Sequence, residues 1–379
     1  MKSAAVDALV RGNPFAAAGF APDHPRIPLR YAMIEFQQKS GKISPGVARA
    51  AIQSLQRAPL VEEPFLIAAL NSLLEGHEIK AEALLQEARR RNPRAEVTRI
   101  LLLDRYLRTE RVQKAASEIA AISRLVPGTA EVLTPQLAKY AVEPKTRGSL
   151  AAVLRSDPGM RDMLLQHLAQ ANADPKIILE LAGPLPSAPP PEPPYWQALL
   201  LQSLVKKGEI EMAHGLWSRF AQVQRPKTAQ MVYDGAFRGL PGSFPFNWHF
   251  ASSPAGVAEP NKSSGLQVDY YGRVDAELAS QLLVLKPGRY RLAFQAAGDV
   301  PERGSSLAWL VICQPGSVSI ATIPITKLSY ADKQIRGEFV VPQSGCPAQW
   351  LRLMGTAAEF PTALNATISN LQVQPAGAS

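Results

Sequence analysis

The spacing of apolar residues changes once along this chain, and that change limits the folds the chain can adopt. Between Arg26 and Ala221 apolar residues recur every three or four positions, the period of a helix with one buried face. From Phe244 onward they recur at every second position, the period of a half-buried strand. The 379 residues also exceed what one hydrophobic core usually serves. We therefore expect a multidomain chain, all-α at first and all-β afterwards.

The helical part is predicted to consist of hairpins of paired helices. The clearest hairpin runs from Pro64 to Pro93, and the next one ends at Pro127, 34 residues later. Ala115 follows Ala81 at the same interval. The expected apolar stripes of the first hairpin are Phe65, Ala68, Ala69 and Leu73, then Ile79, Ala83, Leu84 and Ala88. Such a period is typical of helical repeats, because one hairpin cannot bury its apolar face alone.

Two of these units have small residues early in the second helix and a proline at its end. The residues are Ala81, Ala83, Ala88 and Pro93, then Ala115, Ala116, Ala120 and Pro127. This pattern resembles the tetratricopeptide repeat family, whose aromatic and glycine positions are only partly present here. The resemblance implies an α-solenoid of helical hairpins with a groove that docks a protein partner. The alternative is that the helices serve only as a spacer.

Changes in composition give the expected domain boundaries. Residues 1–183 are predicted to form the repeat-like array, 184–194 a Pro-rich linker or insertion, and 195–230 a further hairpin. Residues 231–243 are expected to connect this hairpin to a β domain at 244–379.

The β part is predicted to be an antiparallel β-sandwich of the jelly-roll type, because many short strands follow one another without helices. The clearest predicted strands are Leu266–Arg273, Gln281–Leu285, Leu307–Cys313, Val318–Ile325, Ile335–Val341, Trp350–Met354 and Thr367–Val373. The stretches Gly265–Val268, Ser280–Leu282 and Lys286–Leu292 resemble galactose-binding-like carbohydrate-binding modules. In that family a strand with a Gln precedes a Pro-Gly turn and a Tyr-containing strand. The resemblance implies a ligand on a concave face or at loop tips, with no chemistry performed.

A glycan face is expected where planar polar side chains and aromatic rings lie together, because rings stack on sugars and planar groups bind hydroxyls. The predicted members are Gln267, Asp269, Tyr271 and Arg273 on one strand, Arg291 and Gln295 on a neighbouring strand, and Trp248 in a preceding loop. The alternative is that Trp248, Trp309 and Trp350 belong to the core and that the polar face is only solvated.

The charge of the chain resides in its helical part. The formal net charge is +9, and Lys and Arg exceed Asp and Glu by eight before Phe244 and by one after it. Because the cations alternate with carboxylates, we expect solvated helix faces, and we do not expect nucleic acid as a partner.

The sequence contains no recognisable catalytic pattern. The five histidines are scattered, no phosphate-binding glycine loop is present, and no Gly-x-Ser-x-Gly elbow occurs. We therefore expect no cofactor, no metal and no catalytic residue. The alternative is a glycoside-active enzyme, which requires a pair of carboxylates in a cleft.

Cys313 and Cys346, the two cysteines, both fall in the β part. They are expected either to form a disulfide, as in exported proteins, or to remain as two reduced thiols. No apolar run approaches the length that a membrane span requires. An export segment upstream of Met1 would imply a periplasmic or envelope-associated scaffold that binds polysaccharide. Without such a segment we expect a cytoplasmic adaptor with a purely structural sandwich.

Overall fold

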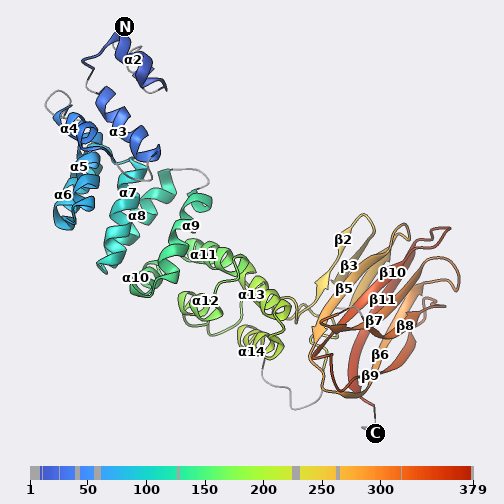
Figure 1. The fold of residues 1–379 in the computed structure, drawn as a ribbon. Coiled ribbons are helices and arrows are strands. Elements are labelled where there is room, and N and C mark those ends of the chain that lie inside the picture. The colour runs from blue at the N-terminus through green and yellow to red at the C-terminus, as the bar shows by residue number, and fades with distance from the viewer. Residues whose placement is uncertain are drawn as a thin grey trace. The chain divides into compact units, whose positions relative to one another are not determined.

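A computed structural model describes residues 9–10, 12–24, 26–38, 43–54, 61–125, 129–223, 231–261, 265–316 and 318–376. Along the chain, helices α2 to α14 are followed by strands β1 to β11 (Figure 1). The protein is therefore a helical part followed by an antiparallel β-sandwich, which confirms the fold class expected from the change of apolar period. Pro127, the expected end of the second hairpin, lies outside the described residues.

The chain forms two compact units, Met1–Leu164 and Leu165–Ser379. The helices up to the division are α2 (Pro14–Phe20), α3 (Arg26–Gln38), α4 (Pro45–Gln53), α5 (Glu63–Leu74), α6 (Glu78–Arg91), α7 (Glu96–Arg108), α8 (Val112–Leu125), α9 (Thr129–Val142) and α10 (Pro144–Leu154). Helix α11 (Pro158–Gln170) contains the division, and α12 (Pro175–Ala182), α13 (Tyr195–Lys206) and α14 (Ile210–Phe220) belong to the second unit. No helix in the described ranges combines the length and the apolarity that a bilayer crossing needs.

Helices α5 and α6, and then α7 and α8, form the two hairpins that the sequence shows most clearly. Helix α8 begins 34 residues after α6, and Ala81 and Ala115 occupy matching, fully buried positions in them. The buried stripe of α5 is Leu66, Ile67, Ala69 and Leu70, and that of α6 is Ala81, Leu85 and Ala88.

The apolar stripes expected for this first hairpin are therefore wrong in phase. Only Ala69 and Ala88 of the expected residues are buried, while Ile79 is 84% exposed. The physical reason is that the run from Phe65 to Leu74 is apolar almost throughout, so it allows several choices of buried face.

Several arginines of the first unit form ion pairs with carboxylates of another helix. Arg89 and Arg99 both contact the carboxylate of Glu118, which is 1% exposed. Arg105 and Arg111 both contact Glu82, and the hydrogen bond from Arg111 lowers the pKa of the Glu82 carboxyl. The mixed charges of α6 to α8 thus connect neighbouring helices.

The sandwich consists of a five-stranded sheet in the order β1-β5-β10-β7-β8 and a six-stranded sheet in the order β2-β3-β4-β11-β6-β9. The strands are β1 (His249–Phe250), β2 (Ser252–Ser253), β3 (Gly256–Asn261), β4 (Gly265–Tyr270), β5 (Ala276–Leu283), β6 (Gly288–Asp299), β7 (Ser306–Gln314), β8 (Ser319–Ile325), β9 (Lys333–Val341), β10 (Ala348–Thr356) and β11 (Leu364–Pro375). Every pairing between neighbouring strands is antiparallel.

The core lies between the two sheets, because alternate residues of each strand point inward. In β7, for example, Leu307, Trp309 and Val311 are fully buried while the residues between them are half-buried. Tyr270 and Phe294 from the six-stranded sheet enter the same core. The period of two in the sequence therefore corresponds to one buried face on each sheet.

Within the second unit, the connecting segment after α14 joins the helices to the sandwich. The Trp217 ring contacts the rings of Tyr233 at 4.9 Å and Phe246 at 5.8 Å. The buried side-chain amide of Gln281 pairs with both the N–H and the C=O of Tyr233. These contacts hold α14, the connecting segment and β5 together.

Candidate functional site

The polar residues predicted on two strands do share one surface, the outward face of the six-stranded sheet. Gln267 and Asp269 project from β4, and Arg291 and Gln295 project from β6, with β11 between these two strands. Arg291 pairs with Glu338 of β9 at 2.8 Å, and the Gln295 Oε1 accepts a hydrogen bond from Asn370 at 3.0 Å. Two of the four side chains are thus engaged by neighbours on the same sheet.

Tyr271 and Arg273 do not extend this face, because β4 ends at Tyr270. Tyr271 is 41% exposed and donates its backbone N–H to Ala255 at 3.0 Å. Arg273 is exposed in the following loop. Strand β4 therefore ends three residues before the predicted end of this strand at Arg273.

Trp248 is a core residue, which corrects its prediction as a sugar-stacking ring. It is 8% exposed, and its ring packs against Phe237 at 5.2 Å and Trp309 at 5.7 Å. Its indole N–H donates to the carbonyl of Asp234 at 3.2 Å. The ring is covered because the connecting segment folds over it, and a buried ring has no free face for a sugar.

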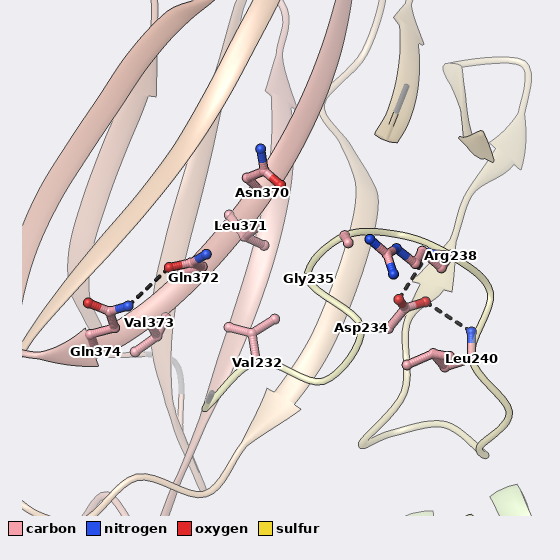
Figure 2. A pocket seen from close by; sticks show the side chains of 11 residues that line it. Val232, Asp234, Gly235, Arg238, Leu240, Asn370, Leu371, Gln372, Val373 and Gln374 are labelled. Carbon is pink, nitrogen blue, oxygen red and sulfur yellow. Dashed lines mark hydrogen bonds between the residues drawn. The ribbon is translucent and has the colours of Figure 1, made fainter. Parts of the chain in front are cut away.

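A small cleft of about 300 Å³ lies beside the six-stranded sheet, between the connecting segment and β11 (Figure 2). Gly235 approaches β11 so closely that a Cβ there would lie 2.0 Å from the Leu371 carbonyl oxygen. The carboxylate of Asp234 accepts three backbone N–H bonds from residues 238–240, and Gln374 donates to Gln372. The polar groups of this cleft largely satisfy one another, and no aromatic ring lines it.

The outward face of the five-stranded sheet is different in character. Trp350 and Arg352 of β10 project from it and lie beside Ile312 and Leu310 of β7, and all four are half-buried. The Arg352 guanidinium lies 5.1 Å from the centre of the Trp350 ring. Since the other four tryptophans are between 0% and 8% exposed, Trp350 is the tryptophan best able to meet a ligand.

Trp350 forms one wall of an open cleft of about 520 Å³, which we call the Trp350 pocket. All of its lining belongs to the second unit: Ala169, Gln170, Asn172, Leu199, Gln202, Ser203, Val205, Lys206, Phe244, Pro245, Gln314 and Trp350. Two aromatic rings, four side-chain amides and one lysine therefore face the same space. Strand β10 supplies Trp350 and β7 supplies Gln314, while the segment before β1 supplies Phe244 and Pro245. Helix α11, the turn that follows it and helix α13 supply the rest.

The two rings of the pocket lie against each other. The Phe244 ring is 5.6 Å from that of Trp350, with 27° between the planes. Trp350 is oriented further by its indole N–H, which donates to the Gln314 Oε1 at 3.2 Å. An oriented, partly exposed pair of rings provides a flat apolar surface with polar groups at its edge.

Phe244 is held in place by its sequence neighbours. The Ser243 hydroxyl donates to Gln197 of α13 at 3.1 Å, and the carbonyl of Pro245 accepts from Leu282 of β5 at 2.8 Å. Phe246, the next aromatic residue, is buried against Trp217 and His214. Burial of His214 also lowers the pKa of its imidazole, so that the neutral ring is favoured there.

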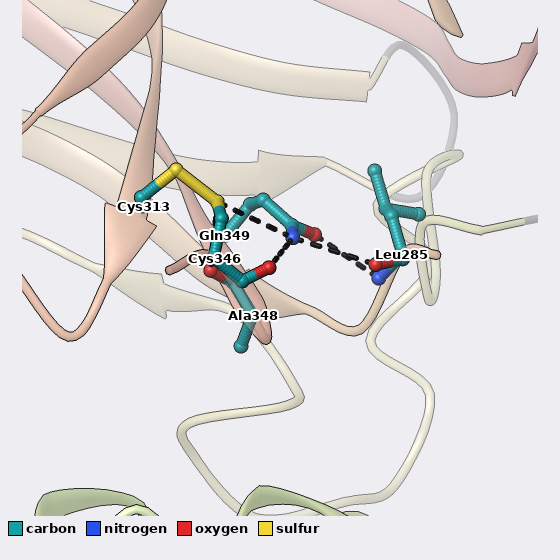
Figure 3. The surroundings of a disulfide bond; sticks show 5 residues. All are labelled: Leu285, Cys313, Cys346, Ala348 and Gln349. Carbon is teal, nitrogen blue, oxygen red and sulfur yellow. Dashed lines mark hydrogen bonds between the residues drawn. A yellow bond between two sulfur atoms is a disulfide. The ribbon is translucent and has the colours of Figure 1, made fainter. Parts of the chain in front are cut away.

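A disulfide joins Cys313 at the end of β7 to Cys346 just before β10 (Figure 3). The buried amide of Gln349 donates to the Cys346 carbonyl at 2.9 Å and accepts the backbone N–H of Leu285 at 3.0 Å. Gln314 and Trp350 directly follow Cys313 and Gln349 in sequence. The disulfide therefore connects the two strand ends that carry one side of the Trp350 pocket.

Two buried polar atoms belong to the cross-strand pair Ser280 and Arg352, two residues along the strands from the pair Leu282 and Trp350. Ser280 and Arg352 are cross-strand neighbours, and neither the Ser280 Oγ nor the Arg352 Nε has a hydrogen-bond partner among the described residues. The Arg352 Nε is 3.2 Å from a Glu277 oxygen, close enough for an ion pair but without hydrogen-bond geometry. Buried polar atoms without partners are rare, and they often mark a place where a water or ligand completes the structure.

The lining of the Trp350 pocket combines aromatic, amide and ammonium groups. Its lining contains no Asp, Glu, His or Cys, so it offers neither an acid pair nor ligands for a transition metal. Across the described residues, no group of three or more His, Cys, Asp or Glu side chains could hold a metal ion. Ring stacking, amide hydrogen bonds and contacts of the Lys206 ammonium group remain as the interactions this lining can make.

None of the residues predicted for the glycan face lines the Trp350 pocket. Phe244 stands at the start of an aromatic run, Phe244-Pro245-Phe246-Asn247-Trp248-His249-Phe250, which was the only local signal. Gln170 and Gln202 reach the pocket from helices α11 and α13, and Asn172 reaches it from the turn after α11. These elements are distant from Trp350 in sequence, and no motif marks the three residues. Only the folded structure brings these residues together.

No family model matches this chain, and no curated protein matches it. Several similar solved structures are carbohydrate-binding modules. The C-terminal family 22 carbohydrate-binding module from Clostridium thermocellum is 13% identical with a TM-score of 0.28, covering 41% of this chain and 99% of that chain. The CBM22-1 xylan-binding domain from Paenibacillus barcinonensis is 14% identical with a TM-score of 0.25, covering 35% and 87%.

The enzymatically active domain of tailspike protein 4 from bacteriophage CBA120 is also similar, at 13% identity and a TM-score of 0.28. The match covers 39% of this chain and only 21% of the length of that chain. All of these likenesses are too remote to carry an argument about a ligand, which must come from the side chains themselves.

Proposed function

We propose that the second unit binds a carbohydrate without transforming it, and that sugar rings stack at the Trp350 pocket. The observation that carries this proposal is the partly exposed pair of rings, Trp350 and Phe244, at the wall of an open cleft. Sugars present flat C–H faces that pack on aromatic rings, while their hydroxyls need planar donors and acceptors.

The polar lining supports a sugar as the ligand. Gln170, Gln202 and Gln314 each offer an amide that both donates and accepts, as adjacent hydroxyls require. The volume of about 520 Å³ lies within the range of small-molecule clefts.

The absence of acids from the pocket lining supports binding over hydrolysis at this place. Glycoside hydrolysis uses two carboxylates on opposite sides of the scissile bond. Glu277, an acid of the neighbouring strand β5, lies beside the cation of Arg352. The proposed role is therefore that of a binding module.

We further propose that the first unit docks a protein partner, so that the whole chain acts as a scaffold. Large apolar side chains are exposed on both sides of the α5–α6 turn, with Leu74 60% and Ile79 84% accessible. Contiguous exposed apolar patches often mark protein contacts, and we propose that these side chains belong to such a patch. Together with a disulfide, which persists in oxidising compartments, these features favour an exported scaffold that holds a polysaccharide.

The carbohydrate proposal can be tested with a glycan array on the full chain, followed by calorimetry with the best ligand. We expect Trp350→Ala to weaken binding at least about 30-fold, since removing a central aromatic anchor costs roughly 2 kcal/mol or more. Trp350→Phe should retain part of the affinity, which separates a lost ring from a disturbed fold. Equal affinity of Trp350→Ala and the unmodified protein, or no glycan bound at all, would contradict the proposal.

A further inference from the structure

The charge in the lining of the Trp350 pocket is of one sign, positive. Lys206 is the only charged residue in its lining, and no carboxylate lines it. Lys206 is exposed in the last turn of α13, and no ion pair to it occurs within the part of the chain that the structure describes. This contrasts with Arg89, Arg99, Arg105 and Arg111 of the first unit, which all contact carboxylates.

A second cation, Arg352, lies against the Trp350 ring. The Arg352 guanidinium lies 5.1 Å from the ring centre, and its side chain is 33% exposed. Its charge is partly balanced by Glu277 at 3.2 Å. The aromatic surface therefore lies near two cations, the ammonium of Lys206 from α13 and the guanidinium of Arg352 from β10.

On the basis of the proposed carbohydrate binding, we propose that the ligand is an acidic glycan whose sugar carries a carboxylate, as a uronic acid does. The sugar ring stacks on the side chains of Trp350 and Phe244, and the sugar carboxylate accepts a charge-assisted hydrogen bond from Lys206. The four amides then bind the hydroxyls. A neutral sugar makes the same stacking contacts but leaves the ammonium group without a partner.

The size of the preference follows from the exposure of Lys206. Because an exposed ion pair contributes up to about 1 kcal/mol, an acidic oligosaccharide should bind about fivefold more tightly than its neutral counterpart at low salt. Salt screens such a pair, so the preference should disappear at roughly 0.5 M ionic strength, while stacking persists.

The test compares oligogalacturonate with the same oligosaccharide after reduction of its carboxyl groups, by calorimetry on the full chain. We expect about fivefold tighter binding of the acid at low salt and equal binding of both in Lys206→Gln. Lys207→Gln is the matched control, because Lys207 is a neighbouring exposed lysine outside the pocket lining, and it should keep the preference.

The outcomes separate this inference from the carbohydrate proposal. Equal affinity for the acid and the reduced sugar, with both lost in Trp350→Ala, overturns the acidic ligand and leaves sugar binding intact. A preference that survives in Lys206→Gln also overturns the inference. If neither form binds and the glycan array is likewise empty, the carbohydrate proposal itself fails.

Discussion

The two outward faces of the sandwich differ in what they can bind. The six-stranded sheet presents Gln267, Asp269, Arg291 and Gln295, a polar face whose groups pair in part with neighbouring strands. The five-stranded sheet presents Trp350 beside half-buried apolar residues and an open cleft. Polar alternation along a strand marks an exposed face, as on the six-stranded sheet. The face proposed to bind differs from it by an aromatic surface that stays partly uncovered.

The disulfide provides the prediction with the largest expected effect, because it joins two strands of the five-stranded sheet. The bond closes a loop of 33 residues, so replacing both cysteines by serine should cost about 3–4 kcal/mol of unfolding free energy. All five tryptophans lie in the second unit, so urea unfolding followed by tryptophan fluorescence reports on that unit.

Glycan affinity should fall in the same double variant, because Gln314 and Trp350 lose a constraint at their strand ends. As a control, reduction of the disulfide in the unmodified protein should lower both the unfolding free energy and the glycan affinity. An unchanged unfolding midpoint would show that the bond does not constrain this sheet.

Replacement of Phe244 should give the next largest effect on glycan affinity. Phe244→Ala removes the ring that lies 5.6 Å from Trp350, and aromatic pairs contribute roughly 0.5–1.5 kcal/mol. We expect a loss of glycan affinity of about two- to tenfold, smaller than for Trp350→Ala, measured by calorimetry. Phe360→Ala is a suitable control, since Phe360 is 81% exposed and outside the pocket. A larger loss in the control than in Phe244→Ala would argue against this pocket.

The polar face should give the smallest effect. Gln267→Ala combined with Asp269→Ala is expected to change glycan affinity less than about twofold and stability by less than about 0.5 kcal/mol, because both side chains are at the surface. A tenfold loss in this variant, with Trp350→Ala unaffected, would move the binding face to the six-stranded sheet.

Much of the fold could be predicted from the sequence, because periodicity depends on local geometry. The strands around Leu307–Cys313 and Trp350–Met354 follow directly from alternation, as does the shared face of Gln267 and Gln295. The buried face of α5 could not be predicted, because nearly all of its residues are apolar and several phases are equivalent.

The candidate site was harder to predict, because it depends on which segments cover which rings. The sequence around Trp248 and Trp350 does not indicate which of the two rings is covered. In the fold the connecting segment buries Trp248, while Trp350 remains half-buried. Gln202 and Lys206 reach the pocket only through the docking of α13 in the second unit. Such contacts are properties of tertiary structure and leave no pattern in the sequence.

The most direct test of the account is a titration of the indole N–H resonances of the ¹⁵N-labelled protein with the glycan selected on the array. Trp350 is half-buried, whereas Trp196, Trp217, Trp248 and Trp309 are 0–8% exposed. We predict that the Trp350 indole resonance, assigned from Trp350→Phe, shifts with ligand while the other four stay in place. An unmoved Trp350 resonance at saturating ligand would contradict sugar stacking at this pocket.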